Sequence, residues 1–446
     1  MNTENLKTEL FKKALEAGFE ECEIYWSDSS SFSVSVYKGN IEKYQNSQSG
    51  GFCFRGLYNG KMGYYFSENA KDPDVDNIIK NAVENSEIIS GGDKEFIYEG
   101  SEKYYKVNVY NDKIDNMTVE DKIQAALNME NAALEYDPRI KVNKAMISTG
   151  ISCVKIDNTK GLKLEEKENY FMAYIENMAV DENETVEKGE IWIGRNIEEF
   201  DPIEIGRKAA EKAILALGGK PVESQKSSVI IKNEVFADIL GCFCGSFFAE
   251  NVQKGFSLLK DKLNSKIASD IVTLVDDPLL EKGNATASFD SEGVATYSKN
   301  VIERGILKTY LYNLKTAAKD GVKSTGNGFK GSFKGSVNTS ATNFYIEKGE
   351  ATFEKMAEEV YEGIVITDVA GLHSGVNWVS GDFSVAAEGF KIEKGKITTP
   401  VNQITIASNF YDMLNDIFIV GNDIKFNASS VGSPSIAVKN ISIAGL

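Results

Sequence analysis

The sequence has almost no histidine, because His373 is the single one among 446 residues. Catalytic zinc sites usually take two or three imidazole ligands from one chain. One histidine cannot supply them, so a histidine-based zinc site made by this chain alone is excluded.

Long apolar runs are also absent, and none approaches the roughly 18–20 residues that a membrane helix needs. The N-terminus, MNTENLKTEL, has no basic region followed by an apolar core, so no secretory signal is predicted. We therefore expect a cytoplasmic protein without a membrane partner.

Positive charge is scarce. The chain has 49 Lys and Arg against 66 Asp and Glu, a formal net charge of -17. This charge repels nucleic-acid phosphates, and no basic stripe with interleaved aromatic residues compensates for it. Nucleic acid is therefore not expected as a direct partner, whereas neutral or basic partners are compatible with the charge.

The cysteines are few, odd in number and mostly scattered, which is not the pattern of a disulfide framework. The closest pair, Cys242 and Cys244, has C-x-C spacing rather than the C-x-x-C of metal and redox motifs. We interpret all of them as reduced thiols, mostly buried. They are Cys22, Cys53, Cys153, Cys242 and Cys244.

The chain length favours two or three domains, and the patterns favour an α+β fold. Residues 1–100 are predicted to form an N-terminal helix and antiparallel-sheet domain. Its helix has an apolar stripe from Leu6 to Leu15, and Asn59-Gly60 signals a hairpin between two strands. Asp72-Pro73 is predicted to begin a second helix, which ends before Gly91-Gly92.

Residues 101–220 are predicted to form a central α+β domain. Thr118 begins a helix with a capping sequence, strands follow over 141–156, 162–179 and 186–194, and a helix covers 203–217. Residues 221–446 are predicted to form a mostly β C-terminal domain with helices near 234–260, 308–320, 352–361 and 409–417.

Three motifs deserve a chemical interpretation. In the segment 371–375 (GLHSG), neighbouring residues of a strand would point to opposite faces, so His373 is poorly placed to activate Ser374. The segment 324–328 (STGNG) could cradle an anion with backbone amides, but without a Walker-type lysine we favour a loop lining a groove. The acidic residues Asp276, Asp277, Asp290 and Glu292 could bind Ca²⁺ or Mg²⁺ or serve as acid and base, but an Asp-Pro turn at Asp277-Pro278 is the preferred interpretation.

Several blocks, in this order, resemble the TldD/PmbA family over nearly the whole chain. They are 17–20 (AGFE), 23–25 (EIY), 51–55 (GFCFR), 63–65 (GYY), 267–269 (IAS), 273–278 (TLVDDP), 289–294 (FDSEGV), 324–327 (STGN), 371–377 (GLHSGVN), 380–384 (SGDFS), 388–389 (EG), 403–407 (QITIA), 412–414 (DML) and 434–436 (PSI).

The resemblance implies a family with two kinds of subunit. TldD-like chains bind zinc through H-E-x-x-x-H and a later cysteine, whereas PmbA/TldE-like chains lack these residues and pair with them. Here the corresponding positions fall on Leu240, Gly241 and Gly245, and no cysteine follows Cys244. The resemblance thus implies a metal-free, non-catalytic subunit, with zinc on a TldD-like partner.

The expected role is to complete a groove for peptides or unfolded proteins in a heterodimeric metallopeptidase. The groove candidates are His373, Asn377, Asp382, Gly326 and Gly375, the glycines because a peptide backbone could approach them closely. The alternatives are a stand-alone homodimeric peptide-binding protein and a hydrolase that uses serine or carboxylates without zinc. A gyrase-related role, suggested by an old family name, is disfavoured as direct DNA contact by the charge.

Overall fold

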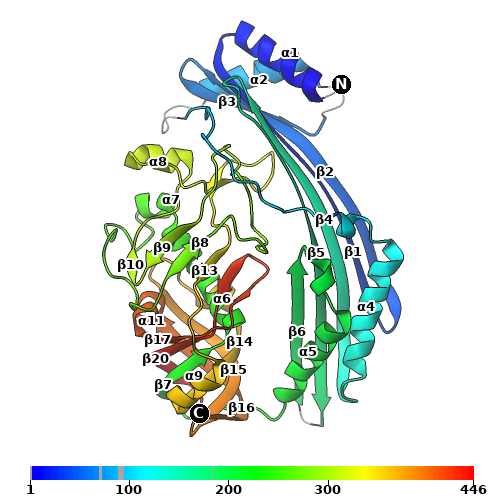
Figure 1. Ribbon diagram of the computed structural model, residues 1–446, viewed down its shortest axis with the longest axis vertical. Coiled ribbons are helices and arrows are strands. Elements are labelled where there is room, and N and C mark those ends of the chain that lie inside the picture. The colour runs from blue at the N-terminus through cyan, green and yellow to red at the C-terminus, as the bar shows by residue number, and fades with distance from the viewer. Residues whose placement is uncertain (1–2, 70–72, 89–94, 183) are drawn as a thin grey trace.

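The computed structural model describes residues 3–69, 73–88, 95–182 and 184–446. A curved antiparallel sheet, here called the N-terminal sheet, runs along the length of the molecule in Figure 1. Its strand order is β3-β2-β1-β4-β5-β6. The strands are β1 (Phe19–Tyr37), β2 (Asn40–Tyr58), β3 (Lys61–Ser67), β4 (Ile140–Asn158), β5 (Lys163–Asp181) and β6 (Glu184–Gly194).

Two tight turns set the register of the first three strands. Lys38 and Gly39 have φ of 52° and 71°, and Asn59 and Gly60 have φ of 49° and 72°. Positive φ at both central residues is the type I′ geometry that fits the twist of a hairpin. The predicted Asn59-Gly60 hairpin is therefore confirmed.

The N-terminal sheet joins the first two predicted units, because β1 pairs with β2 on one side and with β4 on the other. Residues 1–100 and 101–220 thus share one continuous hydrogen-bonded ladder. The division at residues 100 and 220 stays a prediction about folding units.

Helices lie at both ends of this sheet (Figure 1). Thr118 caps α4 through a capping box, as predicted, and Asp201 caps α5. The predicted helix start at Asp72 lies outside the described residues, and Asp74 accepts a hydrogen bond from the Asn77 amide. The helices are α1 (Thr3–Glu16), α2 (Val75–Ile88), α3 (Asp112–Asp115), α4 (Val119–Leu134), η1 (Ile197–Glu199) and α5 (Pro202–Leu215).

The C-terminal region contains a second six-stranded sheet of order β16-β15-β14-β7-β20-β17. An additional β16–β20 pairing makes a closed ring of β7, β14, β15, β16 and β20. The bounds are β7 (Gln225–Ile231), β14 (Glu362–Ala370), β15 (Asp382–Glu393), β16 (Lys396–Asn409), β17 (Ile417–Val420) and β20 (Ile436–Ala444).

A third sheet, of order β10-β9-β8-β13-β19-β18, and a two-stranded β11–β12 sheet complete the region. Their strands are short. The bounds are β8 (Leu274–Asp276), β9 (Lys299–Glu303), β10 (Ile306–Leu307), β11 (Gly328–Phe329), β12 (Asn338–Thr339), β13 (Phe344–Ile346), β18 (Lys425–Phe426) and β19 (Val431–Ser433).

The C-terminal helices are shorter than predicted in two places. The helix expected near 234–260 is broken after Phe243, where Gly241 and Gly245 lower helix stability. The helix expected from 308 begins only at Leu314, because Asn313 caps it. The helices are α6 (Asn233–Phe243), η2 (Cys244–Phe247), α7 (Ala249–Gln253), α8 (Leu314–Asp320), α9 (Phe353–Val360), α10 (Leu372–Gly375) and α11 (Phe410–Asp416).

The N-terminal sheet and the C-terminal region meet through both apolar and polar contacts. One buried apolar cluster contains Tyr25, Cys53 and Ile156 of the sheet together with Phe289 and Phe333 of the C-terminal region. Arg195 donates to the carbonyl oxygens of Gly283 and Asn284, at 2.6 and 3.1 Å. Glu166 accepts from the amide and hydroxyl of Ser288. The C-terminal region lies beside the concave side of the sheet (Figure 1). The α+β fold is confirmed.

Candidate functional site

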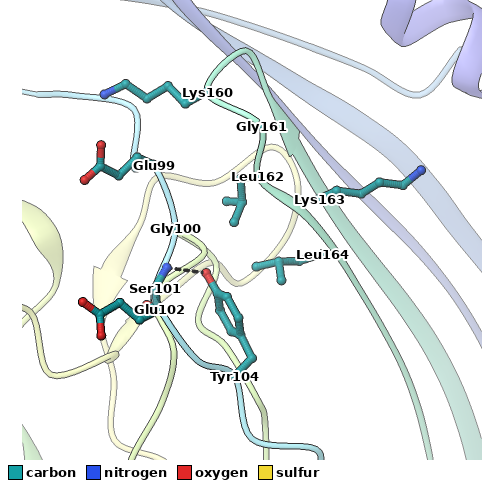
Figure 2. A pocket seen from close by; sticks show the side chains of 10 residues that line it. All are labelled: Glu99, Gly100, Ser101, Glu102, Tyr104, Lys160, Gly161, Leu162, Lys163 and Leu164. Atoms are coloured by element: carbon teal, nitrogen blue, oxygen red, sulfur yellow. Dashed lines mark hydrogen bonds between the residues drawn. The ribbon is translucent and has the colours of Figure 1, made fainter.

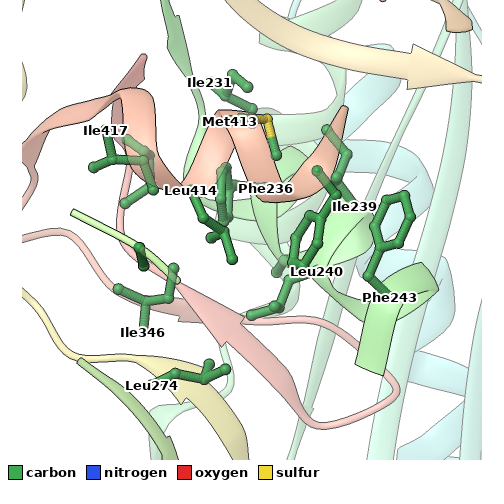
Figure 3. Close-up of a cluster of buried hydrophobic side chains, with 14 of the residues drawn as sticks. Ile231, Phe236, Ile239, Leu240, Phe243, Leu274, Ile346, Met413, Leu414 and Ile417 are labelled. Carbon is green, nitrogen blue, oxygen red and sulfur yellow. The ribbon is translucent and has the colours of Figure 1, made fainter. Parts of the chain in front are cut away.

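The segment α6–η2 contains the positions at which the family resemblance places zinc ligands. Leu240 is fully buried in the main C-terminal core, among the side chains drawn in Figure 3. A Cβ on Gly241 would lie 3.8 Å from Val431, and one on Gly245 would lie 3.3 Å from the Asn251 amide nitrogen. These residues offer packing surface and no ligand atom, so they do not fit a zinc ion.

The two cysteines of this segment differ from metal-binding thiols in their surroundings. Cys244 is buried and Cys242 is partly buried. Burial raises the pKa of both thiols, for Cys244 strongly. Because the thiolate is the form that binds metals and attacks substrates, both are structural here. No group of three or more potential metal ligands occurs within the described ranges.

His373 lies in α10, a single helical turn that follows Gly371 in the left-handed conformation. The expectation of a strand at His373 and Ser374 is therefore wrong, because the positive φ of Gly371 turns the chain. The Ser374 hydroxyl donates to the Gly371 carbonyl at 3.3 Å. The His373 side chain is exposed, and the hydrogen bonds of the described residues do not involve its ring.

Asn377 and Asp382 close the turn that precedes β15. The Asn377 side chain accepts from the amides of Val379 and Ser380, and its own amide donates to the Asp382 carbonyl at 2.8 Å. Hydrogen bonds from Asn409 and Ser380 lower the pKa of Asp382. A Cβ on Gly375 would lie 2.2 Å from the Ser384 carbonyl oxygen, so this glycine is explained by packing within the chain.

This turn lies next to the α6–η2 segment. The Ser246 hydroxyl donates to the Trp378 carbonyl at 3.5 Å, and the rings of Phe256 and Trp378 meet edge to face at 6.4 Å. The structure thus brings His373, Asn377 and Asp382 onto one exposed turn beside the segment that carries the ligand positions in zinc-binding relatives.

Gly326 lies apart from that turn, within a buried polar cluster here called the Asp276 network. Asp276 accepts from Lys299 at 2.8 Å, from the Asn327 side chain at 2.9 Å and from Thr342 at 2.6 and 2.9 Å. Gly326 has φ of 71°, and a Cβ there would lie 3.0 Å from the Ala295 carbonyl. Within the described ranges, no hydrogen bond joins this segment to 371–382. A contact of either glycine with a peptide stays a prediction.

The acidic residues singled out in the sequence accept hydrogen bonds from backbone amides. Asp277 accepts from the Leu279 amide, and Asp290 accepts from the amides of Glu292, Val294 and Gly328. The bonds from Leu279, Glu292 and Val294 are turn interactions, the first at the predicted Asp277-Pro278 turn, whereas the bond from Gly328 spans 38 residues. For Asp276 the turn interpretation is wrong, because its partners Lys299, Asn327 and Thr342 are distant in the sequence. Burial raises the pKa of Asp290 well above its ordinary value and also raises that of Glu292.

Sequence reasoning missed three cations that the structure places in or near the interior. Lys299 pairs with Asp276, Arg55 pairs with Glu23 at 2.7 Å, and Lys330 lies over the Tyr25 ring at 4.9 Å. Arg55 and Glu23 face each other on adjacent strands, so the turn at Lys38-Gly39 could have revealed them through the register it sets. Lys330 has no such signal.

A cavity of about 530 Å³, here called the interface pocket, lies between the N-terminal sheet and the C-terminal region. It is lined by residues from β2 and β3, from α7 and α8, and from the segment after β11. They are Cys53, Arg55, Tyr64, Phe66, Glu95, Phe96, Glu250, Gln253, Lys254, Glu292, Asn313, Leu314, Lys315, Thr316, Lys319, Lys330, Lys334, Gly335, Ser336, Val337 and Asn338. Gly335 lines the cavity, whereas residues 324–328, the segment predicted to line a groove, do not, because Thr325, Gly326 and Asn327 are buried.

Two further depressions follow the serine-rich part of the N-terminal sheet. One of about 630 Å³ is lined by Ser29, Gln48 and Cys153, among others. The other, of about 360 Å³, lies between Ser30 of the sheet and Ser430 of the C-terminal region. Cys153 and Lys167 of the first depression alternate with Ser152 and Glu168 of the second along β4 and β5, so the two open on opposite faces of the sheet. The second depression is here called the serine trough.

A separate open depression of about 600 Å³ lies where the linker 99–104 meets the β4–β5 turn. Figure 2 shows Lys160 and Lys163 pointing in different directions there. The Tyr104 hydroxyl accepts from the Ser101 amide and donates to the Gly293 carbonyl. Because its charged groups do not converge, we interpret this depression as a packing contact between the linker and the β4–β5 turn rather than as a binding site.

Family profiles match three consecutive parts of the chain. The profile for PmbA/TldA metallopeptidase domain 1 matches residues 22–86, that for the central domain matches 112–217, and that for the C-terminal domain matches 224–445. None of the described helices has the length and apolarity required to cross a membrane.

Individual relatives agree with these profiles. Metalloprotease PmbA of Escherichia coli is 31% identical over 328 residues, which cover 73% of this chain and 70% of the relative. The PmbA homolog of Buchnera aphidicola is 27% identical over 431 residues, 95% of this chain and 93% of the relative.

Solved structures extend the agreement to the fold. A Thermotoga maritima protein, with a suggested role as modulator of a DNA gyrase, is 33% identical with a TM-score of 0.93, and the match covers 99% of this chain and all of that one. TldE of Thermococcus kodakarensis, at 22% identity and a TM-score of 0.90, shares the fold over 99% of this chain and all of that one. The chain therefore belongs to the PmbA/TldD family.

Proposed function

We propose that this chain is the metal-free subunit of a TldD/TldE-type metallopeptidase that acts on peptides or unfolded proteins in the cytoplasm. Its partner is a TldD-like subunit that carries the zinc ion. This chain contributes part of the substrate groove and stabilises the partner, without performing the hydrolysis itself.

The α6–η2 segment is the observation that carries this proposal. By the family resemblance, the positions that correspond to zinc ligands are Leu240, Gly241 and Gly245, and the Leu240 side chain is fully buried in the core. A zinc-bound water needs three protein ligands and a general base, and these residues supply neither. The helix is thus used for packing at the place where the partner subunit would use it for chemistry.

The serine trough supports a role in binding extended peptides. It lies along long antiparallel strands, and its lining includes several serine hydroxyl groups, which donate and accept hydrogen bonds without preference for one peptide sequence. A peptide that lies there would lie between the N-terminal sheet and the C-terminal region.

Co-expression with a TldD-like chain tests the proposal directly. We expect a stable complex with one zinc ion per complex, peptidase activity that chelation removes, and no zinc on this chain purified alone. Metal content is measured on each chain by mass spectrometry, and complex mass by light scattering.

Stoichiometric zinc on this chain alone would overturn the proposal. A stable homodimer that binds peptides and ignores the TldD-like chain would favour the stand-alone binding protein. Peptidase activity of this chain alone that survives chelation would favour a zinc-independent hydrolase.

The exposed turn before β15 is tested with His373→Ala, because its ring takes part in no hydrogen bond of the described residues. We expect the complex reconstituted with His373→Ala to cleave peptides several-fold more slowly than the unaltered complex. We expect the same of the complex with Asp382→Asn. Asp112→Asn, on the exposed part of α3, is the matched control and should leave cleavage unchanged. Unchanged cleavage with both groove variants would count against a substrate contact at this turn.

A further inference from the structure

The interface pocket has a positive lining in a protein with a strong negative charge. Six basic side chains line it against three acidic ones, whereas the whole chain carries a net charge of -17. The basic residues come from distant parts of the sequence, including β2, the α7–α8 region and the segment after β11. Such a local reversal of sign marks a place that attracts anions.

The acidic side chains of the pocket are already engaged. Glu95 accepts a hydrogen bond from the Tyr64 hydroxyl, and Glu250 pairs with Lys254 at 2.6 Å. Glu292 accepts from the Leu314 amide at 2.7 Å; burial raises its pKa, whereas that hydrogen bond and the charges of Arg55 and Lys330 lower it. Each of these carboxyl groups thus already has a hydrogen bond or an ion pair within the protein, and Lys334 pairs with Glu68, which does not line the pocket.

Arg55 is the most buried of these cations. Its Nε donates to Glu23, whereas its Nη2 is shielded from solvent and has no hydrogen-bond partner among the described residues. A buried N–H group without an acceptor costs free energy, and such groups are rare enough to need an explanation. The guanidinium thus retains unused donors on the side that Glu23 does not occupy.

Lys330 adds a second unpaired charge beside it. The ion pairs of the described residues do not include Lys330, and its side chain lies over the Tyr25 ring. Burial lowers the pKa of Lys330, the Cys53 thiol and Glu23 raise it, and the charge of Arg55, which repels the ammonium, lowers it. An anion between them would relieve this repulsion.

The rest of the lining indicates an organic anion rather than an inorganic one. Phe66, Phe96, Leu314 and Val337 contribute apolar surface, and the Phe66 side chain is 52% exposed. The volume of about 530 Å³ is typical of a pocket that encloses a small organic group. A carboxylate attached to an apolar side chain satisfies both parts of the lining.

We propose that the interface pocket binds the carboxyl-terminal residue of a peptide, with its carboxylate at Arg55 and Lys330. The apolar side chain of that residue lies against Phe66, Leu314 and Val337. Arginine is suited to this task because the planar guanidinium matches a planar carboxylate. The inference rests on the proposed role of the chain in holding peptides, and it adds that the held peptide has a free end.

The test compares two forms of one tripeptide, Ala-Ala-Phe, by calorimetry on this chain without a partner. We expect the free acid to bind at least about ten-fold more tightly than the amide, as for a charged hydrogen bond. Lys330→Met should weaken binding of the acid about ten-fold and leave the amide unchanged. Lys12→Met, an exposed lysine on α1, is the control and should change neither.

Equal binding of acid and amide would overturn the inference, and this comparison needs no variant to fold. An amidated peptide with an internal glutamate that binds as tightly as the acid would also overturn it, in favour of side-chain carboxylates. Displacement of the acid by inorganic phosphate at equal concentration would indicate a simple anion site. Because no partner or zinc is present, a negative result here leaves the co-purification result unaffected.

Discussion

The C-terminal region contains two buried clusters, one stabilised by apolar packing and the other by hydrogen bonds and an ion pair. Around α6, the cluster is apolar: Leu240 is fully buried, and the rings of Phe243 and Phe410 stack at 4.3 Å. In the Asp276 network, the buried groups are charged or polar, and Asp276 is equally shielded from solvent. Both regions are dense, but only the second depends on specific donors and acceptors.

This difference decides how each region responds to change. Apolar packing is non-directional, so a side chain of similar volume can replace another at modest cost. A buried ion pair has little net stability of its own, but removal of one partner leaves an uncompensated charge. The Asp276 network should therefore be the more fragile of the two.

The largest effect is expected from Asp276→Ala. This change removes the acceptor of Lys299, Asn327 and Thr342 and leaves the Lys299 ammonium buried. The free energy of unfolding should fall by about 3–5 kcal/mol. Urea unfolding followed by tryptophan fluorescence measures the loss.

Lys299→Met tests the same pair from the other side, and the double variant should lose less than the sum of the single losses. Lys308→Met removes an exposed pair with Glu303 at 3.2 Å, so it should cost no more than about 1 kcal/mol. Strictly additive losses at Asp276 and Lys299 would show that the pair does not act as a unit.

Leu240→Ala should be the next most costly change. It leaves a cavity in the apolar cluster around α6, and such truncations cost about 2–5 kcal/mol. Leu240→Met keeps the volume and should cost less than about 1.5 kcal/mol. If the two variants were equally unstable in urea, shape rather than volume would control this cluster, and the contrast with the Asp276 network would weaken.

The fold could be predicted largely because its signals are local. The hairpin at Asn59-Gly60 and the capped helix after Thr118 each depend on a few neighbouring residues, and both are present. The helix expected near 234–260 was too long. The apolar stripe continues through Gly245, but the α-helix ends at Phe243.

The buried polar contacts could not be predicted in the same way, because their members are far apart in the chain. Asp276 meets Thr342 across 66 residues, and Lys330 meets the Tyr25 ring of the N-terminal sheet. Each of these residues also has an ordinary solvent-exposed interpretation in the sequence. The correspondence of Leu240, Gly241 and Gly245 with zinc-ligand positions rests on the family resemblance, not on a local pattern, and stays a prediction.

A smaller effect should appear as a change with pH at Glu292. Burial raises the pKa of this carboxyl group above 4.5, so the folded chain holds the proton more tightly than the unfolded chain. Its contribution to stability is complete below the unfolded pKa and is lost as the pH rises through the folded pKa. One group changes stability by at most about 1.4 kcal/mol per pH unit.

Glu292→Gln removes this titration while it keeps an oxygen for the Leu314 amide. The difference in unfolding free energy between the variant and the unaltered chain should therefore move in favour of the variant from pH 5 to pH 8. Urea midpoints at several pH values measure the slope. A constant difference would contradict the raised pKa.

The smallest effect is expected for a polar contact outside the core, the N-cap of α4. Thr118 accepts from the Asp121 amide at 3.1 Å, and the Asp121 carboxylate accepts from the Thr118 amide at 3.1 Å. Thr118→Ala should cost about 1 kcal/mol, since water can replace the lost acceptor at an exposed helix end. Thr118→Ser keeps the hydroxyl and should cost less, as thermal unfolding can show. A loss at Thr118 as large as that at Asp276 would mean that burial is not what makes the Asp276 network fragile, because both sites lose a side-chain acceptor and differ mainly in their access to water.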